Sequence, residues 1–112
     1  MSVVHDTNLE MVRGDTLAFA IEIEGLDQNL DSAFFSCKKS ANDEEYVFQK
    51  SLDNGITKIT TGKYRVRVAP EDTANIGARV YRYDLQIGVN GDISTVLKGS
   101  LKVVEDITRS RA

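Results

Sequence analysis

The stretch that decides the fold is Pro70-Glu71-Asp72-Thr73-Ala74-Asn75-Ile76-Gly77, which leads into the alternating run Val80-Tyr81-Arg82-Tyr83-Asp84-Leu85-Gln86-Ile87. A proline suits the start of a helical turn, because it fixes φ and lacks the N–H that a first turn leaves unbonded. The two acidic residues after it bring negative charge to unpaired N–H groups, and the glycine ends the turn. The stretch therefore predicts one short helical corner, near residues 70–76, followed by a β-strand.

A tyrosine just beyond such a corner is typical of immunoglobulin-type sandwiches, in which the chain crosses here from one sheet to the other. Tyr81 and Tyr83 are the two candidates for this position. The expected corner residues form one structural group: Pro70, Asp72, Thr73, Tyr81 and Tyr83.

The rest of the chain also alternates with period two, which is typical of half-buried strands. In residues 16–24, Leu17, Phe19 and Ile21 fall on one face. Similar runs occupy residues 9–12, 33–37, 46–52, 56–60, 63–68, 80–89 and 93–104. The expected core consists of the in-phase apolar residues Leu17, Phe19, Ile21, Phe35, Cys37, Val66, Val68, Leu85, Ile87 and Val103.

Turn signals separate these runs every 8 to 12 residues. Asp53-Asn54-Gly55 and Asn90-Gly91-Asp92 each predict a hairpin, because Asn and Gly tolerate a positive φ at little cost. The sequence thus predicts an all-β fold: an immunoglobulin-like antiparallel β-sandwich of seven or eight strands.

The length of 112 residues fits one domain. We expect a partly ordered N-terminal arm at residues 1–11, a single sandwich at 12–108 and a short C-terminal tail at 109–112. Because the principal alternating strand starts only at Thr16, removal of the arm is expected to leave the core folded.

The composition disfavours several classes of function. Fourteen basic and seventeen acidic residues give a net charge of -3 without an extended basic stripe, so nucleic acid is not expected as a partner. Cys37 is the only cysteine, which excludes an intrachain disulfide and a cysteine metal site. No apolar run approaches the ~20 residues of a membrane span, and we expect neither a membrane partner nor a cofactor.

Residues suited to catalysis are few. His5 is the only histidine, and the acidic loop that begins at Asp27 lacks both the glycine and the closing carboxylate of a calcium loop. Asp84 lies in a central strand, where we expect it to find Arg, Lys or backbone N–H partners. The sequence therefore predicts no catalytic or metal-binding residues and a protein that is not an enzyme.

Two terminal segments are expected to be sheet edges that a neighbouring molecule can pair with. They are residues 9–12 and 101–105, and the predicted docking-edge residues are Leu9, Met11, Val12, Leu101 and Val103.

Several motifs occur in a recognisable order. They are Val12-Arg13-Gly14-Asp15-Thr16, Phe48-Gln49-Lys50, Ala69-Pro70-Glu71-Asp72-Thr73-Ala74, Tyr83-Asp84-Leu85 and Thr95-Val96-Leu97-Lys98-Gly99-Ser100-Leu101-Lys102-Val103. In this order the chain, from about Val12 to Thr108, resembles the small β-sandwich domain of tailed-bacteriophage structural proteins, notably the N-terminal domain of upper baseplate proteins.

The resemblance implies a virion structural or adaptor protein of a phage or prophage, which acts by protein–protein docking in a tail, baseplate, neck or head fibre. It also implies other phage structural proteins as partners, self-association in many copies, and a location in the virion after assembly in the bacterial cytoplasm. Two alternatives remain: a carbohydrate- or host-surface-binding module, and glycoside hydrolysis by two loop carboxylates.

Overall fold

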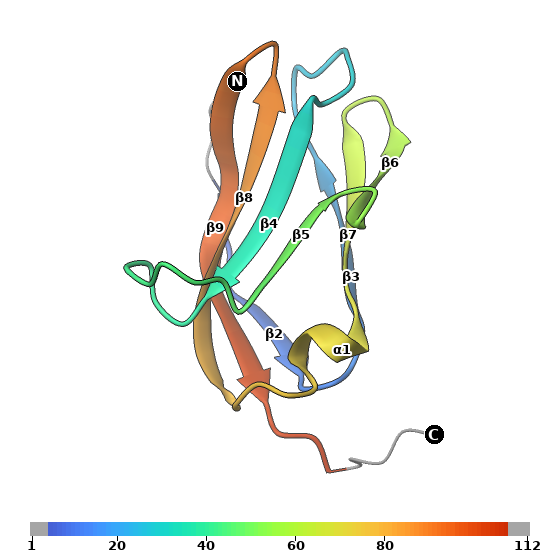
Figure 1. Ribbon diagram of the computed structural model, residues 1–112. Coiled ribbons are helices and arrows are strands. Elements are labelled where there is room, and N and C mark those ends of the chain that lie inside the picture. The colour runs from blue at the N-terminus through green and yellow to red at the C-terminus, as the bar shows by residue number, and fades with distance from the viewer. Residues whose placement is uncertain (1–4, 108–112) are drawn as a thin grey trace.

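Nine strands and one helical turn make up residues 5–107, the part of the chain that the computed structural model describes (Figure 1). Thr108 and the tail expected at 109–112 lie outside the described residues, as do residues 1–4 of the expected arm. The elements are β1 (His5–Asp6), β2 (Leu9–Val12), β3 (Leu17–Glu22), β4 (Ser32–Lys38), β5 (Phe48–Leu52), β6 (Gly55–Thr60), β7 (Lys63–Val68), α1 (Pro70–Thr73), β8 (Arg79–Val89) and β9 (Asp92–Val104).

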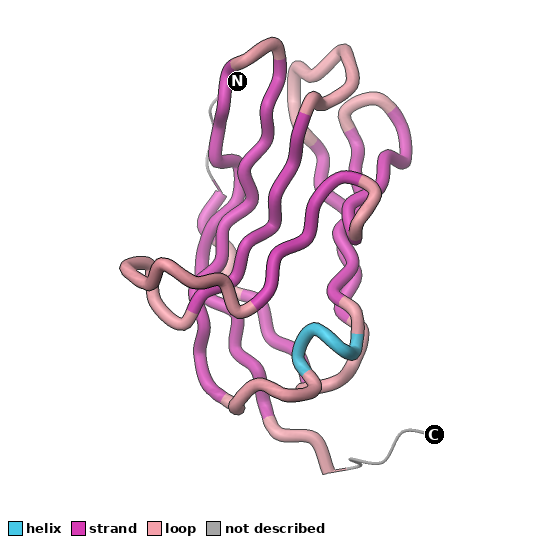
Figure 2. The backbone as a smooth tube through the Cα atoms, in the orientation of Figure 1, coloured by secondary structure: helices cyan, strands magenta, loops and turns pink. Residues whose placement is uncertain are grey.

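The strands form two facing layers, as the tube in Figure 2 shows. Hydrogen bonds connect them in the order β1-β9-β8-β4-β5-β6-β7-β3, and β2 also pairs with β9. The first layer holds β9, β8, β4 and β5, the second holds β6, β7 and β3, and the step from β5 to β6 turns the corner between them (Figure 1). The chain is an immunoglobulin-like all-β sandwich, as predicted.

The core between the layers contains the residues that alternation placed there. Phe35, Cys37, Val66, Val68 and Leu85 are fully buried, and Ile87 and Val103 are nearly so. Leu17, Phe19 and Ile21 face the core as predicted but are only half-buried, because β3 is the last strand of its layer and pairs with no strand on its outer side within residues 5–107.

The helical corner is confirmed and is held by hydrogen bonds. An Asp72 carboxylate oxygen accepts the Ala69 N–H at 2.7 Å, and the buried Thr73 hydroxyl accepts the Gly14 N–H at 2.8 Å. The Tyr81 hydroxyl donates to the Gly77 carbonyl at 2.6 Å. Of the two candidates, Tyr81 is therefore the corner tyrosine of the immunoglobulin-like fold.

Tyr83 has another role. Its hydroxyl donates to the backbone carbonyl of Thr7, between β1 and β2. Both of these strands pair in parallel with β9, and Met11 belongs to the core. Residues 5–11 are thus paired with the sandwich instead of forming a separate arm, and on this packing we expect their removal to expose the core around Met11. They also raise the strand number from the expected seven or eight to nine.

The expected docking edge at residues 101–105 is wrong, because β9 lies between β8 and β2. Leu101 and Val103 are buried within this pairing, opposite Tyr81 and Arg79 of β8. In β2, the backbone from Leu9 to Val12 pairs with β9 on one side. These segments bind each other, so they do not both offer an open edge.

One predicted hairpin is confirmed and the other is not. Asn90 and Gly91 both have positive φ and join β8 to β9 through a two-residue turn. Asp53 and Gly55 also have positive φ, but β5 and β6 run parallel over two residue pairs. The chain turns there into the second layer instead of folding back.

Within residues 5–107, no helix is long and apolar enough to cross a membrane.

Candidate functional site

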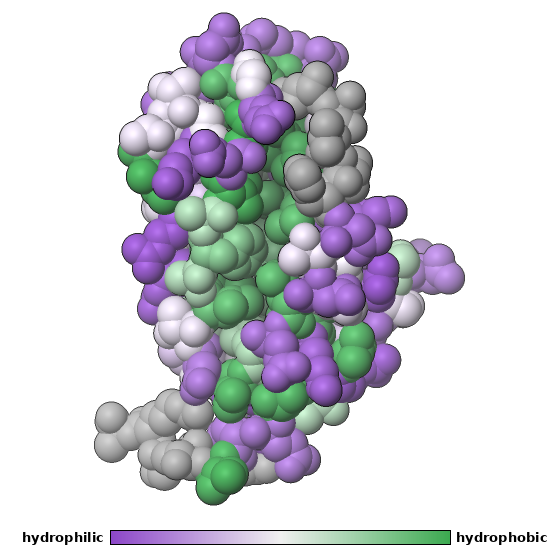
Figure 3. Space-filling view, turned by 180° about the vertical axis from the view of Figure 1, so that it is seen from behind, coloured by the Kyte–Doolittle hydropathy of each residue, from purple (hydrophilic) through white to green (hydrophobic). Residues whose placement is uncertain are grey.

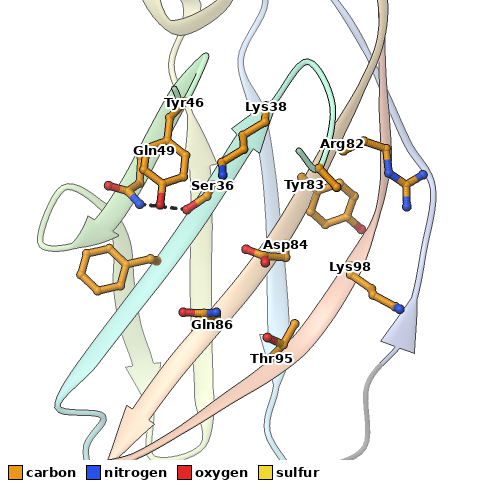
Figure 4. A pocket seen from close by; sticks show the side chains of 12 residues that line it. Ser36, Lys38, Tyr46, Gln49, Arg82, Tyr83, Asp84, Gln86, Thr95 and Lys98 are labelled. Atoms are coloured by element: carbon orange, nitrogen blue, oxygen red, sulfur yellow. Dashed lines mark hydrogen bonds between the residues drawn. The ribbon is translucent and has the colours of Figure 1, made fainter. Parts of the chain in front are cut away.

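The outer face of the layer formed by β5, β4, β8 and β9 carries a hollow of about 920 Å³. Figure 4 shows the side chains along it, which come from all four strands and from the loop after β4. The hollow is lined by Phe34, Ser36, Lys38, Ala41, Tyr46, Gln49, Arg82, Tyr83, Asp84, Gln86, Thr95 and Lys98.

Strand register brings the polar members of this set together, because residues of one phase point to one side of a sheet. Asp84 on β8 lies between Ser36 of β4 and Lys98 of β9. The Gln49 amide on β5 donates to the Ser36 hydroxyl at 2.9 Å (Figure 4). The four strands thus present a row of four different polar groups: an amide, a hydroxyl, a carboxylate and an ammonium group.

Two aromatic side chains flank this row and are open to solvent. Phe34 on β4 is 41% exposed and Tyr46, at the end of the loop after β4, is 51% exposed. The Lys38 ammonium lies 5.0 Å from the centre of the Tyr46 ring, within the range of a cation–π contact. Lys38, the last residue of β4, therefore holds the Tyr46 ring beside the hollow.

An irregularity in β9 shapes the side of the hollow that β9 forms. The register with β8 shifts between Leu85, which faces Leu97, and Gln86, which faces Thr95. Val96 is the extra residue of this bulge. Bulges re-aim side chains and occur often beside binding sites. Here the bulge places Thr95 among the residues that line the hollow.

The electrostatics centre on Asp84. Partial burial raises the pKa of its carboxyl above the usual value, and the positive charge of Lys38 partly opposes that rise. Among residues 5–107 no hydrogen bond or ion pair of Asp84 is found, so the expected lysine partner is present only as the nearby charge of Lys38. Three cations line the hollow with this single carboxylate: Lys38, Arg82 and Lys98. The lining of the hollow is therefore net positive although the whole chain carries a net charge of -3.

The sequence-predicted site residues lie elsewhere, apart from Tyr83, which also borders the hollow. Pro70, Asp72, Thr73 and Tyr81 build the corner, where Asp72 also pairs with Lys50 at 2.9 Å. Alternation puts Phe34, Ser36 and Lys38 out of phase with the predicted core residues Phe35 and Cys37, and the sequence-based prediction did not name them as site residues. The signal that it missed is Phe34, an aromatic residue out of phase with the core.

Catalytic and metal-binding groups do not gather in the described part of the chain. No group of three or more His, Cys, Asp or Glu residues there could hold a metal ion. The Cys37 thiol is fully buried, and burial raises its pKa to about 12, so it is a poor nucleophile. The hollow offers aromatic and polar surface with one carboxylate, an arrangement suited to binding.

In comparisons with known proteins, the chain matches only solved structures. No family model and no curated protein matches the chain. Among solved structures, a Bacteroides vulgatus protein described provisionally as a glycoside hydrolase matches 88% of this chain at 15% identity, with a TM-score of 0.50. The chain spans only 16% of that protein's length.

Two single-domain structures cover nearly the whole chain. The extracellular domain of the voltage-gated sodium channel beta4 subunit covers 96% of it at 12% identity, with a TM-score of 0.49, and 98% of that domain is matched. The mouse leukocyte-associated immunoglobulin-like receptor 1 ectodomain covers 100% at 14% identity, with a TM-score of 0.46 and 95% of its own length matched. At these identities only the fold is shared.

Proposed function

We propose that this chain is a non-enzymatic docking module of a phage or prophage virion. It binds a partner protein through the outer face of the β5-β4-β8-β9 layer. The observation that carries the docking role is the hollow itself, with exposed Phe34 and Tyr46 beside three cations. Aromatic residues and arginine are enriched where proteins bind one another. The virion assignment is supported by the order of sequence motifs described above.

The chemistry of the hollow also indicates the kind of partner. Lys38, Arg82 and Lys98 outnumber the single carboxylate of Asp84, so a complementary surface is acidic and carries an apolar group for Phe34 or Tyr46. Glycoside hydrolysis is disfavoured, because it commonly needs two carboxylates roughly 5 to 10 Å apart and Asp84 is the only one that lines this hollow.

The proposal is tested by incorporation into particles. We expect the tagged chain in phage particles purified after induction of the strain that encodes it. The double substitution Phe34→Ser and Tyr46→Ser should abolish incorporation. The control Ile59→Ser removes an apolar side chain that is 48% exposed on β6, in the other layer, and should have no effect. Particles without the chain would refute the virion role, and full incorporation of the double variant would refute the docking face.

A glycan is the second candidate ligand of the same face. The observation in its favour is Tyr46, which is half-exposed and lines the same hollow as the hydrogen-bonding groups of Gln49 and Asp84. Titration of the protein with fragmented cell-wall polysaccharide tests this alternative. Binding that Tyr46→Ala abolishes and Ile59→Ala preserves would establish it, and no heat of binding at millimolar sugar would exclude it.

A further inference from the structure

The outer edge of β3 is an open strand edge. Among residues 5–107, β3 pairs only with β7, in an unbroken register from Leu17 opposite Val68 to Glu22 opposite Lys63. Proteins usually protect such edges with proline, charged side chains (lysine above all), a bulge or a covering segment. The sequence of β3, Leu-Ala-Phe-Ala-Ile-Glu, contains no proline or lysine, its one charged residue stands at its end, and its pairing with β7 has no bulge.

The backbone groups at this edge can be assigned from the pairing. Just beyond β3, the Ile23 N–H donates to the Gly62 carbonyl at 2.8 Å, toward the β7 side. Backbone groups alternate in direction along a strand, so those of Leu17, Phe19 and Ile21 also point to β7. The N–H and C=O groups of Ala18, Ala20 and Glu22 therefore point outward.

The side chains make this edge suitable for another strand. Ala18 and Ala20 are exposed on the outer face of the layer and are too small to obstruct an approaching strand. Phe19 and Ile21 face the core but are only half-buried. Figure 3, seen from behind, shows an apolar band down the middle of the molecule. A strand added to β3 would cover apolar surface. It would also form hydrogen bonds with the outward-pointing N–H and C=O groups of three residues.

The sequence of β3 is complementary to itself. When two copies pair antiparallel about a twofold axis at Ala20, Ala20 faces its own copy, Ala18 faces Glu22 and Phe19 faces Ile21. The outward-pointing residues then form the hydrogen-bonded pairs, and Phe19 and Ile21 continue the apolar face across the junction.

Charges on β7 fit the same register. Arg67 lies beside Ala18 on the outer face, and Ala18 would in turn face Glu22 of the second copy. Arg67 and that Glu22 are thus two strand spacings apart, about 9.5 Å, with only an alanine between them. Their long side chains can meet over it, and the twofold axis makes two such ion pairs.

We propose that a second copy of this chain binds through β3, antiparallel and centred on Ala20, to join the β6-β7-β3 layers of two molecules into one sheet. This interface leaves the hollow on the other layer free. It does not depend on the proposed docking function, and the two can fail separately.

Cross-linking tests the register. Ala20→Cys places two thiols opposite each other at a Cα separation of about 5.5 Å, which suits a disulfide. Mild oxidation should give a covalent dimer on a non-reducing gel. Ala18→Cys is the matched control, because its two copies would lie roughly 13 Å apart along the strands. The native Cys37 is buried and gives no background. Equal cross-linking of both variants, or none of Ala20→Cys, would overturn the register.

Sedimentation tests the interface itself. The wild-type chain should be a dimer that Ala20→Lys converts to a monomer, since two ammonium groups would meet at the axis. Thr57→Lys adds the same charge on exposed β6, opposite Arg65, and should remain dimeric. Glu22→Arg should weaken the dimer by about tenfold, and adding Arg67→Glu should restore it. A monomeric wild type, or a dimer that survives Ala20→Lys, would refute the proposal.

Discussion

The hydroxyl of Tyr83 donates a hydrogen bond to the backbone carbonyl of Thr7, 76 residues earlier in the chain. The bond fastens the segment between β1 and β2 to the centre of the first layer. Tyr83 is buried because it lies in phase with Tyr81 and Leu85 on the core face of β8, although it takes no part in the corner itself. The N-terminal strands of this sandwich are therefore anchored from inside the core.

Tyr83→Phe should lower the free energy of unfolding by about 0.5 to 1.5 kcal/mol, the usual net value of one hydrogen bond. The ring stays in place, so the loss reports the missing hydroxyl and the unsatisfied Thr7 carbonyl. Tyr46→Phe is the control, because that side chain is half-exposed and should change stability little. Urea unfolding of the three proteins checks this, and equal stability would show that the bond contributes nothing.

Gly99→Ala should detach the N-terminal strands from β9. A Cβ at Gly99 would overlap the backbone of Thr7, and its φ of 156° already disfavours a side chain. We expect a loss of roughly 1 to 3 kcal/mol, typical of overpacking, together with faster amide exchange in β1 and β2. Gly77→Ala is the matched control, because nothing lies within 4 Å of its added Cβ and stability should not fall. Two equally stable variants would mean that the approach of Thr7 to β9 is looser than described.

Phe35→Ala should cost roughly 3 to 5 kcal/mol, the usual range for a fully buried aromatic residue. Phe35 contacts three other rings, of Phe19, Phe48 and Tyr83. The adjacent Phe34→Ala should cost far less, because Phe34 is 41% exposed on the other face. Chemical denaturation of this pair checks the assignment of inner and outer faces, and a reversed order would contradict it.

The Cys37 thiol should not react with a disulfide reagent at pH 8 while the protein is folded. Burial raises its pKa to about 12, so almost no thiolate exists, and the sulfur is inaccessible. In denaturant the reaction should be complete within minutes. Native labelling as fast as that of the unfolded chain would show that β4 opens readily.

Asp84→Asn should stabilise the protein at neutral pH. Burial raises the pKa of this carboxyl in the folded state, so the folded protein binds the proton more tightly than the unfolded one. Wild-type stability therefore falls as pH rises from about 4, the ordinary value, through the raised pKa. The advantage of the variant should appear over this window, persist above it and vanish below pH 4. Thermal unfolding from pH 3 to 8 measures it, and a pH-independent difference would contradict the role of ionisation.

Much of this fold was predictable because local chemistry decides it. Alternation placed Phe35, Leu85 and Ile87 in the core, since side chains of one phase share one face of a strand. Pro70 with its acidic neighbours predicted the corner, and Asn90-Gly91 predicted the hairpin, since few residues tolerate positive φ. These statements concern residues near each other in the chain, and they needed no knowledge of neighbouring strands.

Only the tertiary structure decided which strands are neighbours. The turn at Asp53-Asn54-Gly55 has hairpin chemistry, yet the chain crosses there to the second layer. Alternation indicates that Phe34 and Asp84 face outward, but it does not show that they line one hollow. Nor does it distinguish β9, which is paired on both sides, from β3, which is paired on one side only among residues 5–107. Period-two patterns determine which way a side chain points, whereas strand order arises from the packing of the whole chain, and the candidate surfaces of this protein depend on that order.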